Sequence, residues 1–117
     1  MELKRVVVTG LGALTPVGNN VAETWENLVK GISGAGPITH FDASKFKTHF
    51  ACEVKNFNGT DYIDRKELRK MDLYTQYAIA AAKEAVEDSG MDLEKEDLNR
   101  IGVIYGAVSY THLTLPT

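Results

Sequence analysis

An alanine-rich segment in the second half of the chain constrains the fold more than any other feature. Residues 77–82 read Tyr-Ala-Ile-Ala-Ala-Ala, and they lie between Asp72, which is typical of a helix start, and Gly90, which is typical of a helix stop. A surface helix usually carries charged residues on one side, whereas alanine lets a neighbouring backbone approach closely. We therefore expect a helix that ends near Ser89 and is packed on several sides, in a central layer of the molecule.

The first 31 residues have the order strand, glycine-rich loop, helix. Residues 4–9 contain an unbroken valine run, which is typical of a strand buried on both faces. A loop rich in glycine follows, and then Asn20 with Glu23 forms the pattern of a helix-capping box. Gly31 ends the predicted helix. This order is typical of the opening of an α/β unit.

Shorter elements are predicted along the rest of the chain. Residues 31–47 are expected to be irregular, and residues 50–54 to form a short strand. A second capping-box pattern opens a short helix over residues 64–70. An acidic helical turn is predicted over 93–98 and an apolar strand over 101–106.

Composition limits the classes of partner. The chain has 13 Lys and Arg against 16 Asp and Glu, a net charge of -3, so as a whole it offers little attraction to nucleic acid. The charge is uneven, because the first 70 residues hold 10 of the cations and only 8 of the acids. A single cysteine excludes an internal disulfide framework and fits a reducing cytosol. We expect neither a signal peptide nor a membrane span.

The glycine-rich loop of residues 9–18 is a weak candidate for a nucleotide site. A strand followed by Gly-x-Gly resembles the start of a dinucleotide-binding motif, in which a helix N-terminus holds pyrophosphate. However, Thr15 stands where the third glycine belongs, Pro16 delays the helix, and no strand with a terminal acid follows at the expected distance. We interpret the glycines as residues that permit tight turns at a buried loop.

Four further side chains belong to types that take part in catalysis or metal binding. Cys52 lies in a predicted strand beside Glu53, an acid that would disfavour a thiolate, so we interpret it as a small buried apolar side chain. His40, His49 and His112 share no metal-ligand spacing and are interpreted as surface or loop residues. The sequence therefore predicts no catalytic, cofactor-binding or metal-binding residue.

The run Arg65-Lys66-Glu67-Leu68-Arg69-Lys70 gathers four cations at the start of helical structure. A cation at an exposed helix N-terminus costs about 0.3–1 kcal/mol, so a partner could be the reason for the run. The partner would be an acidic surface, attracted less strongly at high salt. Charge runs are more often simply solvated faces, and the residues alone leave both interpretations open.

Six segments, taken together, resemble the opening of a beta-ketoacyl-acyl-carrier-protein synthase of the type II kind. No one segment is decisive, but six in the family's order and at its spacing are specific. The resemblance covers residues 1–107, about the first quarter of the family's length. The segments are Arg-Val-Val-Val-Thr-Gly-Leu-Gly at 5–12, Thr-Pro-Val-Gly-Asn at 15–19, Ile-Thr-His-Phe-Asp at 38–42, Arg-Lys-Glu-Leu-Arg-Lys-Met-Asp at 65–72, Asp-Ser-Gly at 88–90 and Ile-Gly-Val at 101–103.

The resemblance implies an α/β, thiolase-like layered fold, of which this chain would be the N-terminal portion only. Members of the family elongate fatty acyl chains as cytoplasmic homodimers, by decarboxylative condensation of an acyl thioester with malonyl carrier protein. A cysteine in a Thr-Ala-Cys segment takes the acyl chain, and histidines in His-Gly-Thr and Gly-His segments assist. None of these strings occurs here, so no catalytic role carries over and the chain by itself is expected to be inactive.

One role does carry over by position. In the family, an acidic acyl carrier protein bearing a phosphopantetheine thioester docks on cations that precede Met-Asp. Here those cations are Lys66, Arg69 and Lys70, with Arg65 nearby. Two alternatives to the enzyme portion are a stand-alone carrier-docking module and a nucleotide-binding α/β domain.

Residues 108–117 have no counterpart in the family. We interpret them as an artefactual tail, out of frame or derived from an adapter, and exclude them from the predicted domain of residues 1–107. Without its missing neighbours, the central helix would expose apolar faces. We therefore expect aggregation or loose packing of the chain by itself.

Overall fold

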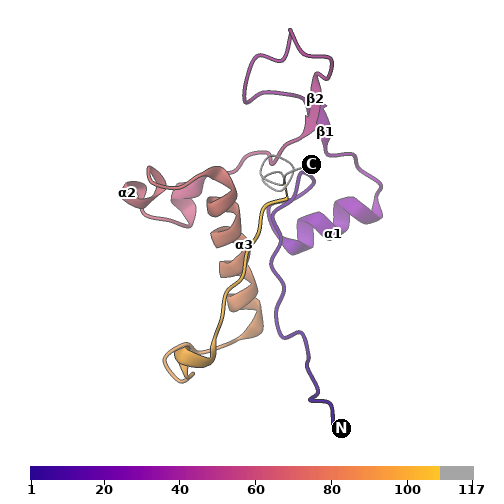
Figure 1. Cartoon of the computed structure of the whole chain (residues 1–117). Coiled ribbons are helices and arrows are strands. Elements are labelled where there is room, and N and C mark those ends of the chain that lie inside the picture. Colours follow the sequence, from indigo (N-terminus) through magenta and orange to yellow (C-terminus); the bar gives the residue numbers. More distant parts are fainter. Residues whose placement is uncertain (109–117) are drawn as a thin grey trace.

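The computed structural model describes residues 1–108, and its longest element is helix α3 (Figure 1). No helix in this part of the chain combines the length and apolar character that crossing a membrane requires. The elements are α1 (Val21–Val29), β1 (Ala35–Pro37), β2 (Phe50–Cys52), η1 (Gly59–Asp61), α2 (Arg65–Leu68), α3 (Leu73–Ser89) and η2 (Leu98–Arg100), where η denotes a 3-10 turn.

Helix α1 begins and ends where the sequence predicts. The side chain of Asn20 accepts a hydrogen bond from the backbone N–H of Glu23 at 2.8 Å. The Glu23 carboxylate reaches back to the backbone N–H of Asn19, at 3.1 Å, one residue before the group that a standard capping box uses. Gly31 follows the helix with φ +69°, a left-handed conformation that glycine adopts at no steric cost. The predicted N-cap and stop are therefore confirmed.

Helices α2 and α3 also occur where they were predicted, but their first residues differ in detail. Asp72 precedes α3 and Gly90 ends it with φ +67°. Neither Asp64 nor Asp72 makes a side-chain capping hydrogen bond, so the capping box expected at α2 is wrong. The helices still form because α2 is bounded by turns and α3 has tertiary contacts, which outweigh the small contribution of a cap.

Two glycines let the amino-terminal loop lie directly on α3. A Cβ atom added to Gly12 would lie 2.8 Å from the backbone nitrogen of Ala85 and closer still to the carbonyl oxygen of Ala81. One added to Gly10 would lie 2.7 Å from the backbone nitrogen of Ser89. Real Cβ atoms essentially never approach so closely, so only glycine fits at either position. Alanine on the helix and glycine on the loop together permit backbone-to-backbone contact.

Two carboxylates of α3 hold the same loop by its backbone. Glu84 accepts hydrogen bonds from the backbone N–H groups of Ala13 and Val21, both at 2.9 Å. Asp88 accepts one from Leu11, also at 2.9 Å. Since Val21 is the first residue of α1, Glu84 joins the loop, α1 and α3 at a single side chain.

Strands β1 and β2 form an antiparallel pair that projects from the rest of the molecule (Figure 1). Ala35 pairs with Cys52, and Pro37 pairs with Phe50. The strand predicted near residues 50–54 is thus confirmed in a shorter form. Strand β1 lies in the segment expected to be irregular, because its sequence, Ala-Gly-Pro, has low strand propensity and only the pairing defines it.

The strands predicted over residues 4–9 and 101–106 do not form within residues 1–108. A strand exists by hydrogen bonding to a neighbour, and neither segment has one in the described part of the chain. Their apolar side chains are exposed: Val6 is 89% accessible and Ile104 100%. The turn predicted over 93–98 is confirmed in part: residues 93–95 form a turn in which the backbone N–H of Lys95 donates to the carbonyl oxygen of Asp92 at 3.0 Å, and η2 begins at Leu98. The parallel sheet of an α/β fold is therefore absent from residues 1–108.

The chain buries little of its apolar surface. In the described part of the chain, the buried apolar residues are Ala43 and Ala80, whereas large side chains such as Trp25 and Phe50 are more than 60% accessible. Among the alanines of α3, only Ala80 is buried, at 4% accessible. The expectation of a helix packed on several sides in a central layer stays a prediction, because residues 1–108 cover only part of α3.

Substitution of Gly12 tests the contact between the loop and α3. Gly12→Ala is expected to destabilise the contact by about 1–3 kcal/mol, because backbone atoms cannot move aside as a flexible side chain does. The amides of Ala13 and Val21 should then exchange with solvent about tenfold faster or more, as measured by NMR. Gly36→Ala is the control, since nothing lies within 4 Å of its added Cβ. Equal effects of the two substitutions would contradict the role given to Gly12.

Candidate functional site

The four cations of the α2 region project from one side of a short helical stretch. They occupy positions i, i+1, i+4 and i+5, and the backbone of Arg69 continues the helical geometry with φ −66° and ψ −17°. All four side chains are exposed, whereas Leu68 between them is half-buried. We call this group the basic surface; it consists of Arg65, Lys66, Arg69 and Lys70.

Most of the basic surface is free of internal ion pairs. Lys70 lies 3.3 Å from Glu67, and both side chains are more than half exposed. Within residues 1–108, Arg65, Lys66 and Arg69 have no carboxylate within 4.0 Å. An exposed pair such as Lys70–Glu67 is worth at most about 1 kcal/mol and is easily exchanged for another partner. The cations are therefore available to an acidic surface.

The structure removes one argument that the sequence offered for a partner. The run was expected to oppose the dipole of a helix N-terminus. Helix α2 has a single turn, Arg65–Leu68, so its dipole is small, and Arg69 and Lys70 follow its C-terminal end, where cations are favoured. The observations that favour a partner are therefore the exposure of the four cations and the lack of ion pairs at three of them within the described residues.

An aromatic cluster connects the α2 region to α3. Phe57 stacks on Tyr62 with ring centroids 5.8 Å apart and meets Tyr77 of α3 edge to face at 5.0 Å. Leu68 packs against Gly59, where an added Cβ would lie 2.7 Å from its side chain. The basic surface is thus carried by a short helix with a defined attachment, although its cations themselves are solvated.

The glycine-rich loop lacks the free donors that a nucleotide phosphate requires. The backbone N–H groups of Leu11 and Ala13 already donate to Asp88 and Glu84. The N–H of Val21 at the start of α1 also donates to Glu84. A pyrophosphate at this helix N-terminus would meet two carboxylates instead of free amides, so the geometry opposes the dinucleotide interpretation.

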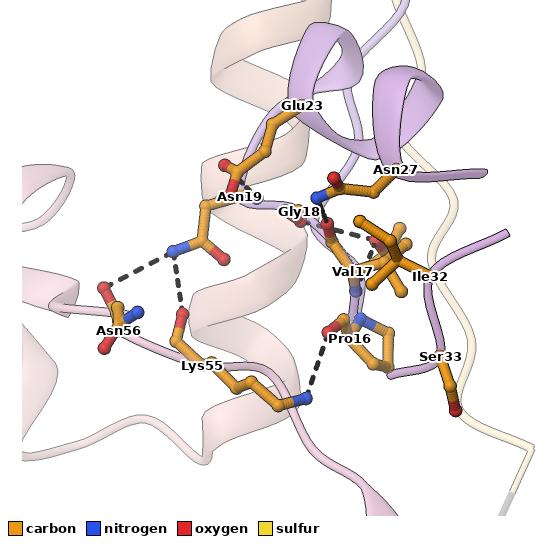
Figure 2. Close-up of a pocket in the computed structure, with 11 residues that line it drawn as sticks. Pro16, Val17, Gly18, Asn19, Glu23, Asn27, Ile32, Ser33, Lys55 and Asn56 are labelled. Carbon is orange, nitrogen blue, oxygen red and sulfur yellow. Dashed lines mark hydrogen bonds between the residues drawn. The ribbon is translucent and has the colours of Figure 1, made fainter. Parts of the chain in front are cut away.

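A polar cleft of about 380 Å³ lies between this loop, α1 and the segment after β2 (Figure 2). The ammonium group of Lys55 donates to the carbonyl oxygens of Pro16, Gly34 and Glu53 at 3.0, 2.7 and 3.0 Å. The Asn19 amide donates to the carbonyl oxygen of Lys55 at 2.9 Å. All three N–H donors of the ammonium group are used in these hydrogen bonds. Lys55 therefore holds together the loops that line the cleft.

The cysteine and the histidines form no catalytic arrangement in the described residues. Cys52 is exposed at the end of β2, so the expectation that it is buried is wrong: the two-stranded sheet has no second layer above it. His40 and His49 are exposed, as expected, and His112 lies outside the described residues. Residues 1–108 contain no group of three or more His, Cys, Asp or Glu side chains that could hold a metal ion.

Solved structures place this arrangement in a class of enzymes. The ishigamide ketosynthase/chain length factor matches 75% of this chain and 22% of its own, with a TM-score of 0.70 and 41% identity. AntDE:AntF, a type II PKS acyl-carrier protein in complex with its ketosynthase bound to the hexaketide, matches 84% of this chain and 24% of its own, with a TM-score of 0.65 and 31% identity. The chain therefore has the fold of part of a ketosynthase, and these neighbours support the expected thiolase-like fold.

Sequence comparison gives the family. Residues 3–115 match the model of the beta-ketoacyl synthase N-terminal domain, and the chain belongs to this family. It is 53% identical over 104 residues to 3-oxoacyl-(acyl-carrier-protein) synthase 2 of Staphylococcus aureus (strain COL), covering 89% of this chain and 25% of that protein. It is 50% identical over 107 residues to the enzyme of the same name from Vibrio harveyi, covering 92% and 26%. The predicted resemblance is confirmed, and the chain spans about a quarter of these relatives.

The loop that carries His40 depends on the ionised form of Glu53, which gives a pH prediction. Its carboxylate accepts hydrogen bonds from the hydroxyl and backbone N–H of Thr39, at 2.7 and 3.0 Å, and the hydroxyl contributes most to lowering the pKa of Glu53. A lowered folded-state pKa means that this stabilisation is present above the unfolded value of about 4.3 and is lost as the pH falls through the folded value.

We expect the Glu53 carboxyl to titrate below the usual glutamate range, followed by the ¹³C shift of its carboxyl carbon in NMR. Thr39→Val removes the hydroxyl at similar volume and should raise the pKa of Glu53. It should also move the loss of the loop's structure to higher pH. The control is Thr60→Val, whose hydroxyl donates to Asn58 and lies outside this group. An unchanged titration in Thr39→Val would show that the hydroxyl does not set the pKa.

Proposed function

We propose that this chain is the N-terminal portion of a condensing enzyme that elongates fatty acyl chains by joining an acyl thioester to malonyl-acyl-carrier protein. The observation that carries the proposal is the family match over most of the chain, together with about 50% identity to two 3-oxoacyl-(acyl-carrier-protein) synthases. The proposal includes a cytoplasmic homodimer as the state of the whole enzyme. Within it, residues 1–107 supply scaffold and part of a docking surface.

The docking part of the proposal assigns Lys66, Arg69 and Lys70 to the binding of an acidic acyl carrier protein. Their exposure, and the lack of ion pairs at Lys66 and Arg69 within the described residues, support this role. A ketosynthase of similar fold has been solved in complex with an acyl-carrier protein, which supports the class of partner. Opposite charge on two surfaces mainly raises the rate of encounter and fixes orientation, so the contact should weaken as salt increases.

The sequence lacks the family's catalytic segments, so the scaffold role is assigned without chemistry of its own. A nucleophilic cysteine needs a base or helix N-terminus to form a thiolate, and Cys52 lies at the end of an exposed two-stranded sheet. The alternative of a stand-alone docking module assigns the same residues to the carrier. It differs in requiring that the chain bind the carrier without any further part.

Charge reversal tests the docking surface. The double variant Lys66→Glu, Arg69→Glu is expected to weaken binding of an acidic acyl carrier protein by about tenfold or more, since it replaces attraction by repulsion. Binding is measured by NMR titration of the carrier at low and at physiological salt. The matched control is Lys45→Glu, Lys47→Glu, which reverses two exposed cations in the loop between β1 and β2. Equal losses in both double variants would show non-specific attraction instead of a docking surface.

Activity measurements test whether the chain catalyses condensation by itself. We expect the purified chain to form no condensation product from acyl and malonyl carrier proteins beyond that in a blank without the chain. The product is measured by mass spectrometry of the carrier. Cys52→Ala serves as the control variant. Product that disappears with Cys52→Ala would overturn the scaffold assignment and make Cys52 the nucleophile. Absence of turnover is the result that the scaffold form requires, and carrier binding without turnover is the result that the docking-module form requires.

A further inference from the structure

One Asn-Gly pair occurs in the chain, Asn58-Gly59, and it lies in sequence between β2 and the basic surface. An asparagine before glycine is especially prone to lose its side-chain amide, because glycine has no side chain to shield its backbone nitrogen from the asparagine carbonyl. The other asparagines all precede residues that have side chains; they are Asn19, Asn20, Asn27, Asn56 and Asn99. Its neighbour thus sets Asn58 apart from every other asparagine of the chain.

The attacking and leaving groups of this reaction are not engaged by other contacts in the described residues. Asn58 is exposed to solvent. Neither its side-chain nitrogen nor the backbone N–H of Gly59 donates a hydrogen bond within residues 1–108. The amide oxygen of Asn58 is held, because it accepts hydrogen bonds from the backbone N–H and the hydroxyl of Thr60, at 3.1 and 2.7 Å.

We propose that Asn58 is a modification site, at which the chain loses ammonia and acquires aspartate or isoaspartate. The overall reaction consumes one water molecule and releases one ammonia, with no oxidation or reduction. The inference is independent of the proposed enzymatic role, because the reaction requires only this segment, water and hydroxide.

The reaction proceeds through a cyclic imide. The Gly59 nitrogen loses its proton to hydroxide and bonds to Cγ of Asn58; the Cγ–Nδ2 bond then breaks, and Nδ2 leaves as ammonia with a proton taken from water. Water opens the five-membered imide at Cγ to give aspartate, or at the backbone carbonyl to give isoaspartate. In isoaspartate the main chain runs through Cβ and Cγ. Because the first step needs a deprotonated amide, the rate increases with pH.

The folded geometry delays closure of the imide. The ring requires the Gly59 nitrogen to lie on the same side as Cβ about the Cα–C bond of Asn58, whereas a ψ of 108° turns this nitrogen away from Cβ. Rotation about that bond moves Gly59, which is buried. A Cβ atom added to Gly59 would lie 2.6 Å from Oε1 of Gln76 and 2.7 Å from the side chain of Leu68, so the backbone has no room to turn. The reaction therefore proceeds from a locally open state, in which Gly59 has left these contacts.

Isoaspartate in place of Asn58 changes the attachment of α2. It adds a methylene to the main chain beside Gly59, where even a Cβ atom does not fit. The contact between Gly59 and Leu68 then cannot re-form as before. Because Leu68 belongs to the helix that carries the basic surface, the modification permanently loosens the support of that surface.

Mass spectrometry of the aged chain tests the site. The chain is incubated at mildly alkaline pH and digested, and fragmentation of the peptides locates each replacement of NH₂ by OH. We expect the replacement at Asn58 before any other asparagine, with aspartate and isoaspartate separated by chromatography. Asn56, two residues away, is the internal control. An unchanged Asn58, or equal rates at Asn58 and Asn56, would overturn the proposal, and aspartate without isoaspartate would exclude the imide.

A packing variant tests whether local opening controls the rate. Leu68→Ala is expected to speed the modification by about fivefold or more, because the half-buried leucine packs against Gly59. Hydrogen exchange at the Thr60 amide, which donates to Asn58, should rise by a similar factor. The matched control is Leu28→Ala on the exposed side of α1, which should leave both rates unchanged.

Unfolding the chain gives a second readout that does not depend on either variant. In concentrated urea the three proteins should react at one common rate, faster than that of the folded parent chain. Equal rates in the folded and the unfolded parent chain, or an unchanged rate in Leu68→Ala, would overturn the role given to the packing of Gly59. Circular dichroism verifies that each variant keeps its helices before incubation.

Discussion

The direct contact between the amino-terminal loop and α3 is the constraint on which the rest of the described structure depends. Gly10 and Gly12 lie so close to the helix backbone that no side chain fits. Glu84 then accepts hydrogen bonds from the loop and from the first residue of α1. Because a charged acceptor holds two backbone donors at one place, the loop, α1 and α3 share a single geometry. An interpretation of the same glycines as a phosphate-binding motif fails because those amides are already bonded.

The exposed surface of the described chain also follows from the composition of α3. A helix that uses alanine to admit close neighbours gains stability only where neighbours exist, and within residues 1–108 they cover part of α3. The chain spans about a quarter of the length of its relatives. Within residues 1–108, the valines near the amino terminus are exposed and their backbone groups make no hydrogen bond to another segment.

The proposed docking of a carrier protein depends on exposed charged residues and not on the contacts that hold α3. The cations of the basic surface are solvated and contribute little to stability, yet the aromatic cluster around Phe57 fixes the short helix that carries them. Exposure with little internal pairing is what a docking surface for an acidic partner requires. Catalytic and metal sites require groups brought together from distant parts of a chain, and residues 1–108 contain no group of three or more His, Cys, Asp or Glu side chains that could hold a metal ion.

Local chemistry, read from the sequence by itself, determined the elements whose signals lie within a few residues. Asn20 and Gly31 bound α1, and Gly90 ends α3. Tertiary structure decided which segments found partners: β1 is defined by its pairing with β2, and Cys52 is exposed because the described residues place no second layer on this pair. The physical reason is that caps and turns are satisfied by neighbours in sequence. The backbone groups of strands, the side chains of a core and the carboxylate of Glu84 find their partners only in atoms distant in the chain.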